Sequence, residues 1–340
     1  MKRLVFVTQQ VDPASPVLGA TVAKVSALAE RLGEVTVIAD AAVEGALPAN
    51  CRVHTFGAAT RVGRGARFEA ALARELRRRP RPAAVVAHMC PIFAVLAAPL
   101  ARPLGVRVLL WYTHWRASRL LALAERLSSA VISVDRRSFP LDSRKLVPIG
   151  HGIDLARFAC AERPKRDVLE LLALGRTSPA KGIDTVIRAV AQVPGARLTQ
   201  HGPSLTEAEI LHRGELGQLV ADLGVADRVT IGDSVPADAV PALLGAADCL
   251  VNNMRAGATD KVVYEAAATC LPVLASNPAL DGLLPAALRF PRDDPAALAA
   301  RIRELAVADR TAIGRDLRLR VERDHGVEGW AERVIEVAGR

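Results

Sequence analysis

The sequence predicts an α/β protein of two doubly wound domains, each with a parallel sheet covered by helices. Short apolar runs alternate with longer helical patterns along all 340 residues, as happens where helices connect parallel strands. A chain of this length usually divides into two hydrophobic cores. The strand pattern starts afresh after a glycine-rich and charged stretch near residue 155. We therefore expect domains over residues 1–154 and 155–340, with the last helix able to pack back on the first domain.

Six strands are expected in each half. The apolar runs lie at residues 3–8, 34–39, 52–56, 83–87, 106–112 and 130–134, and then at residues 170–174, 197–200, 229–231, 249–251, 272–275 and 288–290. In such sheets ligands bind beyond the carboxyl ends of the strands. Two domains of this kind that face each other would enclose a cleft, so polar residues just after the strands are the candidates for function.

The charge and composition restrict the class of partner. The formal net charge is +9, and 39 of the 45 basic residues are arginines, a bias typical of a GC-rich genome such as a bacterial one. The densest basic stretches, residues 61–67 and 74–81, are either solvated helix faces or a surface for anionic lipid. Aromatic residues make up only 4% of the chain, too few for a nucleic-acid stacking platform. Nucleic acid is therefore not expected as a partner.

The cysteines and apolar segments bear on location. Five cysteines are scattered without metal-binding or framework spacing, which favours reduced thiols in the cytoplasm. The apolar run at residues 4–7 is too short for a signal peptide. The long apolar region at residues 83–112 is interrupted by His88, Arg102 and Arg107, so it does not predict a membrane span. We expect a cytoplasmic protein, with peripheral contact at the inner face of the membrane as a further option.

A pair of cations flanks one strand-to-helix loop. The apolar strand at residues 170–174 leads into Gly175 and Arg176, and Lys181 stands before the amphipathic helix at residues 185–193. Free N–H groups at a helix start favour anions, and two cations would add charge-assisted bonds to a diphosphate. The alternative is a pair of exposed charges. The sequence thus predicts a positively charged pocket for two linked phosphates.

A second glycine follows the next strand. Gly202 comes after the strand at residues 197–200, and Thr206 and Glu209 have the spacing of a helix capping box. Without a β-carbon, Gly202 would let a ligand approach the backbone. An ordinary turn explains the glycine equally well.

A glutamate lies within a strongly apolar helix. The helix after Lys261 is apolar or small nearly all round, which predicts packing on several sides. Glu265, in its middle, needs a partner because a buried carboxylate is otherwise poorly solvated. Ribose hydroxyls are one such partner, since a carboxylate accepts two hydrogen bonds at once. A surface position or a buried salt bridge are the alternatives.

Three residues of the first half also lie just after an apolar strand or just before a helix. His114 and His88 each follow an apolar strand, although a lone histidine is more often structural. Gly19 precedes the helix at residues 21–32, where a phosphate of donor or acceptor could approach closely.

The order of these motifs resembles glycosyltransferase family 4, the glycosyl transferases group 1. The resemblance extends over most of the chain and is carried by Pro148-Ile149-Gly150-His151-Gly152-Ile153-Asp154, Leu174-Gly175-Arg176, Lys181-Gly182, Ala247-Asp248, Glu265-Ala266 and Pro272-Val273-Leu274-Ala275-Ser276. It implies the GT-B fold, two Rossmann-like domains facing across a cleft. It also implies that the sugar keeps its anomeric configuration on transfer.

The resemblance assigns roles to several residues. Arg176 and Lys181 would bind the donor diphosphate, Glu265 the ribose, and His114 would lie near the sugar and the acceptor. The family commonly has two glutamates separated by seven residues, and the position of the first is Gly257 here. The donor sugar would then meet either the side chain of Asp260 or backbone N–H groups of the preceding loop. That loop comprises Gly257, Ala258 and Thr259.

The function implied is transfer of a sugar, of hexose type, from a UDP- or GDP-linked donor to a hydroxyl acceptor. The acceptor would be a cell-surface glycan or a lipid-linked precursor in glycan biosynthesis. No metal and no cofactor is expected, the nucleotide sugar being a co-substrate. One alternative is a GT-B nucleotide-sugar epimerase, and another is a degenerate protein that binds sugar nucleotides without catalysis. A dinucleotide-dependent enzyme is disfavoured because no G-x-G-x-x-G follows the first strand.

Overall fold

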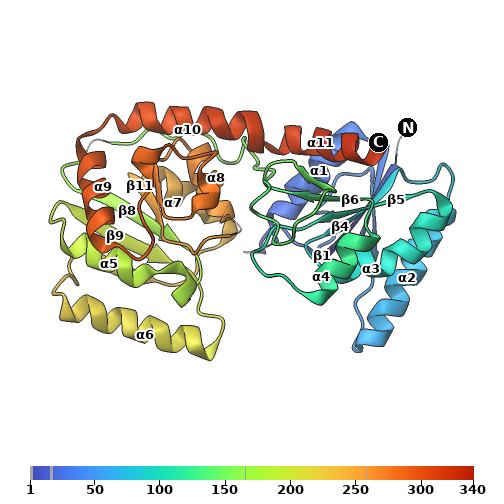
Figure 1. Ribbon diagram of the computed structural model, residues 1–340, viewed down its shortest axis with the longest axis horizontal. Coiled ribbons are helices and arrows are strands. Elements are labelled where there is room, and N and C mark those ends of the chain that lie inside the picture. Colours follow the sequence, from blue (N-terminus) through green and yellow to red (C-terminus); the bar gives the residue numbers. More distant parts are fainter. Residues whose placement is uncertain (1–2, 16–17, 165, 258) are drawn as a thin grey trace. The chain divides into compact units, whose positions relative to one another are not determined.

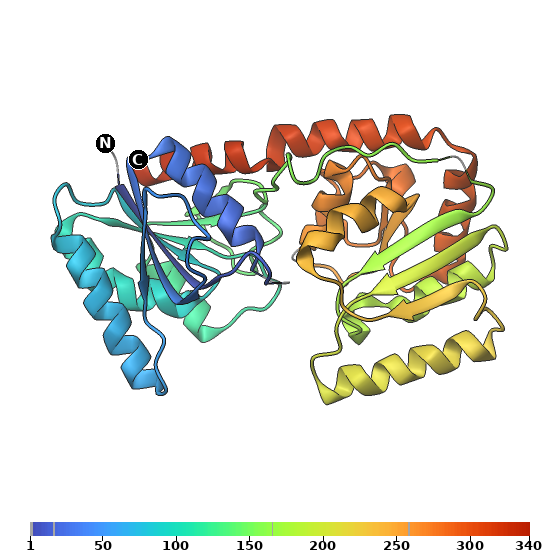
Figure 2. The ribbon, with the colours of Figure 1, turned by 180° about the vertical axis from the view of Figure 1, so that it is seen from behind.

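The chain folds as two compact units, each built on its own parallel sheet. The computed structural model describes residues 3–15, 18–164, 166–257 and 259–340. The first unit comprises the chain up to Asp154 together with Asp324–Arg340, and the second comprises Leu155–Arg323. Figures 1 and 2 show a sheet with helices on both faces in each unit. The predicted fold class, two doubly wound α/β domains, is confirmed.

The first unit contains a seven-stranded sheet in the order β3-β2-β1-β4-β5-β6-β7. All neighbouring strands are parallel. The strands are β1 (Arg3–Val11), β2 (Glu34–Ala42), β3 (Cys51–Thr55), β4 (Ala84–His88), β5 (Arg107–Trp111), β6 (Ala130–Ser133) and β7 (Leu146–Pro148). The inner strands β1, β4, β5 and β6 are largely buried on both faces. Their sequences are therefore apolar runs rather than alternating patterns.

Helices cover both faces of this sheet. Helices α1 and α11 lie on one face and α2, α3 and α4 on the other (Figure 1). Their bounds are α1 (Ala20–Arg31), α2 (Arg61–Arg77), α3 (Pro91–Ala101), α4 (Arg119–Leu127) and α11 (Val327–Gly339). The last helix packs on α1, and its Trp330 meets Trp111 of β5 edge to face at 5.6 Å. Two large aromatic rings thus fix the end of the chain to the first sheet.

The second unit contains a five-stranded sheet in the order β10-β9-β8-β11-β12, again parallel throughout. The strands are β8 (Leu169–Leu174), β9 (Ala196–His201), β10 (Val229–Gly232), β11 (Cys249–Asn252) and β12 (Val273–Ala275). Helices α5 and α6 lie on one face, and α7 and α8 on the other (Figure 1). The helices are α5 (Ile183–Ala191), α6 (Glu207–Asp222), α7 (Val240–Ala246), α8 (Lys261–Ala268), α9 (Pro295–Val307) and α10 (Arg310–His325). Among the helices of the described residues, none is both long and apolar enough to cross a bilayer.

Two strand assignments differ from the prediction. Strand β7 was not expected, because it is three residues long and ends in Pro148, so the segment reads as a connection. Conversely, no strand forms at residues 288–290. Only Arg289 makes a bridge to Ala275 there, since Pro285 and Pro291 flank the segment and cannot donate ladder hydrogen bonds.

The expectation of five reduced cysteines is wrong for one pair. Cys160 and Cys270 form a disulfide with Cα atoms 5.0 Å apart, although 110 residues separate them in sequence. The fold brings them together because the segment after the first unit runs along the end of α8, where Ala161 N donates to Thr269 O at 3.4 Å. Cys51, Cys90 and Cys249 are free thiols.

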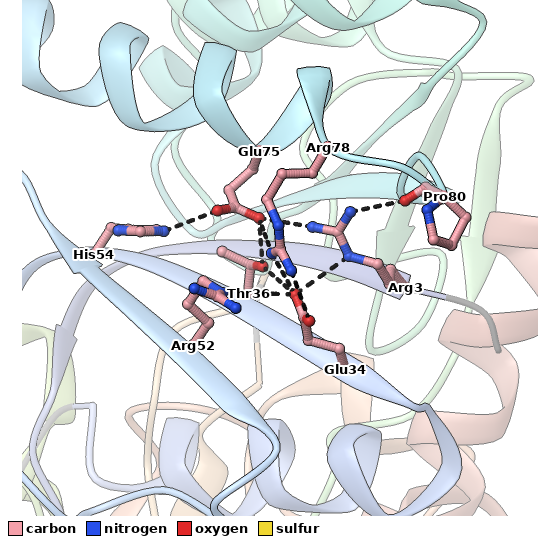
Figure 3. Close-up of polar contacts among 8 residues, drawn as sticks. All are labelled: Arg3, Glu34, Thr36, Arg52, His54, Glu75, Arg78 and Pro80. Atoms are coloured by element: carbon pink, nitrogen blue, oxygen red, sulfur yellow. Dashed lines mark hydrogen bonds and ion pairs between the residues drawn. The ribbon is translucent and has the colours of Figure 1, made fainter.

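A buried ion network joins β1, β2 and α2 (Figure 3). Glu75 is 1% exposed and accepts hydrogen bonds on Oε2 from Arg3 Nη2 and Arg78 Nη1, both at 2.6 Å. Burial alone would raise the pKa of Glu75, but bonds from Arg78, His54 and Thr36 hold that pKa below its usual value. Hydrogen bonding from Arg78 likewise lowers the pKa of Glu34 to about 2. Both carboxylates are therefore ionised and join the helix to the sheet.

We expect Glu75→Ala to destabilise the first unit by about 3 kcal/mol, because it leaves buried Arg3 with one fewer carboxylate partner. Chemical denaturation followed by circular dichroism measures the change. Glu69→Ala, an exposed glutamate of the same helix, is the matched control and should change the free energy of unfolding by less than about 0.5 kcal/mol. Equal effects of the two substitutions would contradict a structural role for the network.

Candidate functional site

The strand order of the second sheet identifies the edge at which a ligand can bind. The order reverses between β8 and β11, which are neighbours in the sheet but are separated in sequence by two further strands. At such a switch point the following loops diverge to opposite faces and leave a crevice at the carboxyl ends. The loops concerned are residues 175–182 after β8 and residues 253–260 after β11. Most of the residues predicted to bind the donor lie in these two loops.

Lys181 lies along the backbone of Gly175. A β-carbon built on Gly175 would come within 2.8 Å of Lys181 Cε and Nζ, and Gly175 has a φ of +137°. The backbone angle therefore requires glycine, and a β-carbon would also displace the end of the Lys181 side chain. Lys181 ends the 3₁₀ turn Pro179–Lys181, and Gly182, with a φ of +55°, turns the chain into α5. Lys181 thus lies next to Gly175 in space and immediately before Gly182 in sequence.

The loop after β11 supplies the counter-ion of Lys181. Lys181 Nζ lies 2.5 Å from Asp260 Oδ2, and Asn252 Nδ2 donates to the same oxygen at 2.8 Å. Asp260 is the N-cap residue of α8, yet its side chain makes no capping bond. Asn253 Nδ2 donates to Gly182 O at 3.1 Å and so joins the two loops a second time.

The structure therefore brings Gly175, Lys181 and Asp260 close together, and two asparagines that the sequence analysis missed, Asn252 and Asn253, join the two loops. A role of Gly175, Lys181 and Asp260 in donor binding stays a prediction. Asn252 and Asn253 are both buried. Two consecutive amides at the end of an apolar strand were the signal that could have identified them, because buried amides need partners.

Arg176 has a different partner. Its Nη1 lies 3.2 Å from Glu209 Oε1, and the arginine side chain is 54% exposed. Glu209 belongs to the first turn of α6 and also accepts the N–H of Leu205 on Oε2 at 2.7 Å. The predicted cap is confirmed, since Thr206 Oγ1 accepts the N–H of Glu209 at 3.3 Å. Arg176 is thus oriented by the start of α6.

Glu265 forms the salt bridge that was one of its alternative explanations. It is buried in α8, and its Oε1 lies 2.6 Å from Nζ of Lys261, one helical turn earlier. Lys261 is a third cation at this edge of the sheet that the sequence analysis did not assign. A role of Glu265 in ribose binding stays a prediction.

The predicted pocket is less positive than the sequence implied. Arg176, Lys181 and Lys261 each face one carboxylate, from Glu209, Asp260 and Glu265 respectively. The sequence places Arg176 and Lys181 in one loop, but their carboxylate partners lie 33 and 79 residues further along the chain, respectively. An arriving anion therefore meets ion pairs rather than isolated charges.

The remaining residues of the β11 loop are held by local bonds. Gly257, with a φ of +119°, accepts a hydrogen bond on its carbonyl from Asn277 Nδ2 at 3.4 Å. Thr259 Oγ1 accepts the hydroxyl of Tyr264 at 3.1 Å. Ala258 lies outside the described residues. Beside this loop a cavity of about 470 Å³ is lined in part by Ala256 and Ser276.

Gly202 is explained by packing within the chain. A β-carbon at Gly202 would lie 1.8 Å from Gly175 O. The backbones of the loops after β8 and β9 therefore touch, and only glycine fits between them. Close approach of a ligand to Gly202 stays a prediction.

The first unit holds the other two predicted site residues. His114 follows β5, accepts the N–H of Arg116 on Nδ1 at 3.0 Å and stacks on Trp115 with ring centroids 5.3 Å apart. Gly19 precedes α1, and a β-carbon there would lie 2.7 Å from Ser15 O. Both are ordered by their own loops, and contact of either with a substrate stays a prediction.

His88 is part of the core of the first unit. It is 4% exposed, and its Nδ1 lies 3.1 Å from Thr8 Oγ1. Desolvation, with a smaller contribution from the charge of Lys24, lowers its pKa well below the usual value. The imidazole is therefore neutral, and the structural interpretation of this histidine is the better one.

Comparison with known proteins finds relatives of the sequence. Residues 169–307 match the family model described as Glycosyl transferases group 1. The D-inositol 3-phosphate glycosyltransferase of Mycobacterium marinum (strain ATCC BAA-535 / M) is 30% identical over 184 residues, 51% of this chain and 37% of that protein. The chain thus spans less than half the length of this curated relative.

Solved structures resemble the whole chain. Sucrose-phosphate synthase from Thermosynechococcus elongatus has a TM-score of 0.80 at 19% identity, covering 99% of this chain and 98% of that one. HepE from Anabaena, in complex with UDP and glucose, has a TM-score of 0.77 at 17% identity, with 99% of both chains covered. At these identities the likeness establishes the fold alone, and that fold is GT-B, as the motifs implied.

We expect Gly202→Ala to destabilise the second unit by about 1–3 kcal/mol, because the added methyl group overlaps the carbonyl oxygen of Gly175. Gly214→Ala is the matched control. That glycine lies within α6 with no atom within 4 Å of the β-carbon position, so the substitution should stabilise the protein by about 0.5–1 kcal/mol. Thermal unfolding of both variants measures the two effects, and equal signs would contradict the packing role of Gly202.

Proposed function

We propose that this chain, whose residues 169–307 match the family model of the glycosyl transferases group 1, transfers a sugar from a nucleoside-diphosphate sugar to a hydroxyl acceptor. The observation that carries the proposal is the position of Lys181 and Arg176 on one loop at the switch point of the second sheet. The UDP and glucose in the complex of HepE, a protein of the same fold, support a UDP-linked donor, and a GDP-linked donor is the alternative.

The proposed chemistry is transfer of a hexosyl group with retention and without a metal ion. The bond between the anomeric carbon and the diphosphate breaks, and a bond from that carbon to the acceptor oxygen forms on the same face. The acceptor proton passes to the departing diphosphate. Arg176 and Lys181 stabilise the negative charge that grows on this leaving group.

Three further roles follow from the family resemblance. Glu265 accepts the ribose hydroxyls, which requires its carboxylate to exchange or share the bond to Lys261. His114 acts near the sugar and the acceptor hydroxyl. Gly19 gives the donor phosphate access to the backbone at the start of α1.

The acceptor is proposed to be a cell-surface glycan or a lipid-linked precursor, reached in the cytoplasm at the inner face of the membrane. Part of the basic stretch on α2 is engaged within the protein, since Arg64 pairs with Asp40 and Arg78 with Glu75. The exposed arginines that carry the proposal are Arg61, Arg74 and Arg77.

These arginines predict binding to anionic membranes at low salt. Sedimentation with phosphatidylglycerol vesicles should recover most of the protein at 50 mM salt and little at 500 mM, because screening weakens such contacts. Replacing all three by glutamine should abolish the binding. Equal recovery on neutral phosphatidylcholine vesicles would contradict an electrostatic contact.

Lys181→Ala should lower turnover by about 100-fold or more, because it removes a cation from the leaving group. The wild-type protein is first screened by thermal shift against UDP, GDP and their sugar conjugates, and slow hydrolysis of the stabilising donor is then measured. Arg188→Ala, an exposed cation on α5, is the matched control and should retain activity. Near-normal turnover of Lys181→Ala would contradict the proposal.

The same assay separates the alternatives. A nucleotide-sugar epimerase would convert the donor sugar in the absence of any acceptor, whereas a transferase hydrolyses or transfers it. A degenerate binding protein would be stabilised by the donor without consuming it.

A further inference from the structure

The ion pair between Lys181 and Asp260 engages the ammonium group that is proposed to bind the diphosphate. The pair is close, with Nζ and Oδ2 separated by 2.5 Å, and only partly exposed, at 15% for the lysine side chain and 21% for the aspartate. The end of the Lys181 side chain lies beside Gly175, where a β-carbon would otherwise be. Asp260 engages one of the three N–H donors of the ammonium group, so an incoming anion competes with this carboxylate for the charge of Lys181.

Asp260 has a second anchor that does not depend on Lys181. Asn252 Nδ2 donates to Asp260 Oδ2 at 2.8 Å, from a buried position at the end of β11. Among the residues that the structure describes, both side-chain bonds of this carboxylate end on Oδ2, and Oδ1 accepts none. The carboxylate would thus stay in place, with free acceptor capacity, when the lysine is withdrawn.

We propose that the donor diphosphate displaces Asp260 from Lys181, and that the released carboxylate, still held by Asn252, accepts hydrogen bonds from hydroxyls of the donor sugar. The inference rests on the proposed function and assigns the sugar-recognising residue within it. Asp260 would supply an acidic group in the loop where Gly257 stands in place of the glutamate expected from the family pattern.

The exchange follows from the charges. A diphosphate carries at least two negative charges and outcompetes a single carboxylate for one ammonium group. Once displaced, Asp260 is an anion beside an anion, which is unfavourable unless neutral donors satisfy it. Hydroxyls of an attached sugar are such donors, whereas a free nucleoside diphosphate offers none at that place.

The inference therefore predicts discrimination between substrate and product. A nucleotide sugar satisfies Asp260 when it binds, whereas the nucleoside diphosphate left after transfer does not. In the wild-type protein the intact donor should bind more tightly than the diphosphate, and the product should leave readily.

Asp260→Asn is the main test, with affinities for UDP and UDP-glucose, or for GDP and GDP-mannose, measured by isothermal titration calorimetry. The amide does not compete for Lys181, so the nucleoside diphosphate should bind about fivefold more tightly than in the wild type. The additional affinity contributed by the sugar should fall in the same variant. If Asp260 had a purely structural role, the substitution would change the affinities for both ligands in the same direction.

Asp260→Glu separates the two parts of the inference. It keeps the charge but displaces the carboxylate by one methylene, so the diphosphate affinity should stay near the wild-type value while the contribution of the sugar is lost. Asp184→Asn is the matched control, because it removes one negative charge from the adjacent first turn of α5. It should change neither the affinity for the nucleoside diphosphate nor the additional affinity contributed by the sugar.

Two outcomes would overturn the inference. One is an unchanged or weaker affinity of Asp260→Asn for the nucleoside diphosphate, and the other is an undiminished contribution of the sugar in both Asp260 variants. If the wild-type protein binds none of these nucleotides, the proposed function fails and with it the premise of the inference. Unfolding curves of each variant show whether a loss of binding reflects loss of the fold.

Discussion

The reversal of strand order between β8 and β11 determines where the second unit can bind a ligand. Because both strands are parallel and adjacent, their carboxyl ends emerge at one edge of the sheet while the chain leaves them toward opposite faces. The cation-bearing loop and the acid-bearing loop meet at this edge for that reason. The contacts between Lys181, Asp260 and the two asparagines are consequences of this topology.

The charges at this edge are paired before any ligand arrives. Each pair joins a cation to a carboxylate whose side chain is at most 21% exposed. Under the proposed function, such pairing would help to hold a diphosphate in a defined position. Binding would then be an exchange of partners, in which the carboxylates take part as well as the cations.

Glycine has two different roles around this site. At Gly175 the positive φ disfavours any side chain, and the end of Lys181 lies where a β-carbon would be. At Gly202 the absent side chain lets one backbone lie against another. In the first unit, ion pairs rather than glycines bring the elements together. Those around Glu75 join α2 to the sheet, away from the carboxyl ends of its strands.

The sequence by itself determined the fold class, most strands and the loops that carry the candidate site, because apolar runs and the residues that follow them are local patterns. It also identified Arg176 and Lys181 as two cations of one loop and Glu265 as a carboxylate in need of a partner. Only the tertiary structure decided the partners of Lys181, Arg176 and Cys160, since Asp260, Glu209 and Cys270 reach them across long stretches of chain. Short edge segments such as β7 were equally out of reach, because pairing with a neighbouring strand, rather than local sequence, makes them strands.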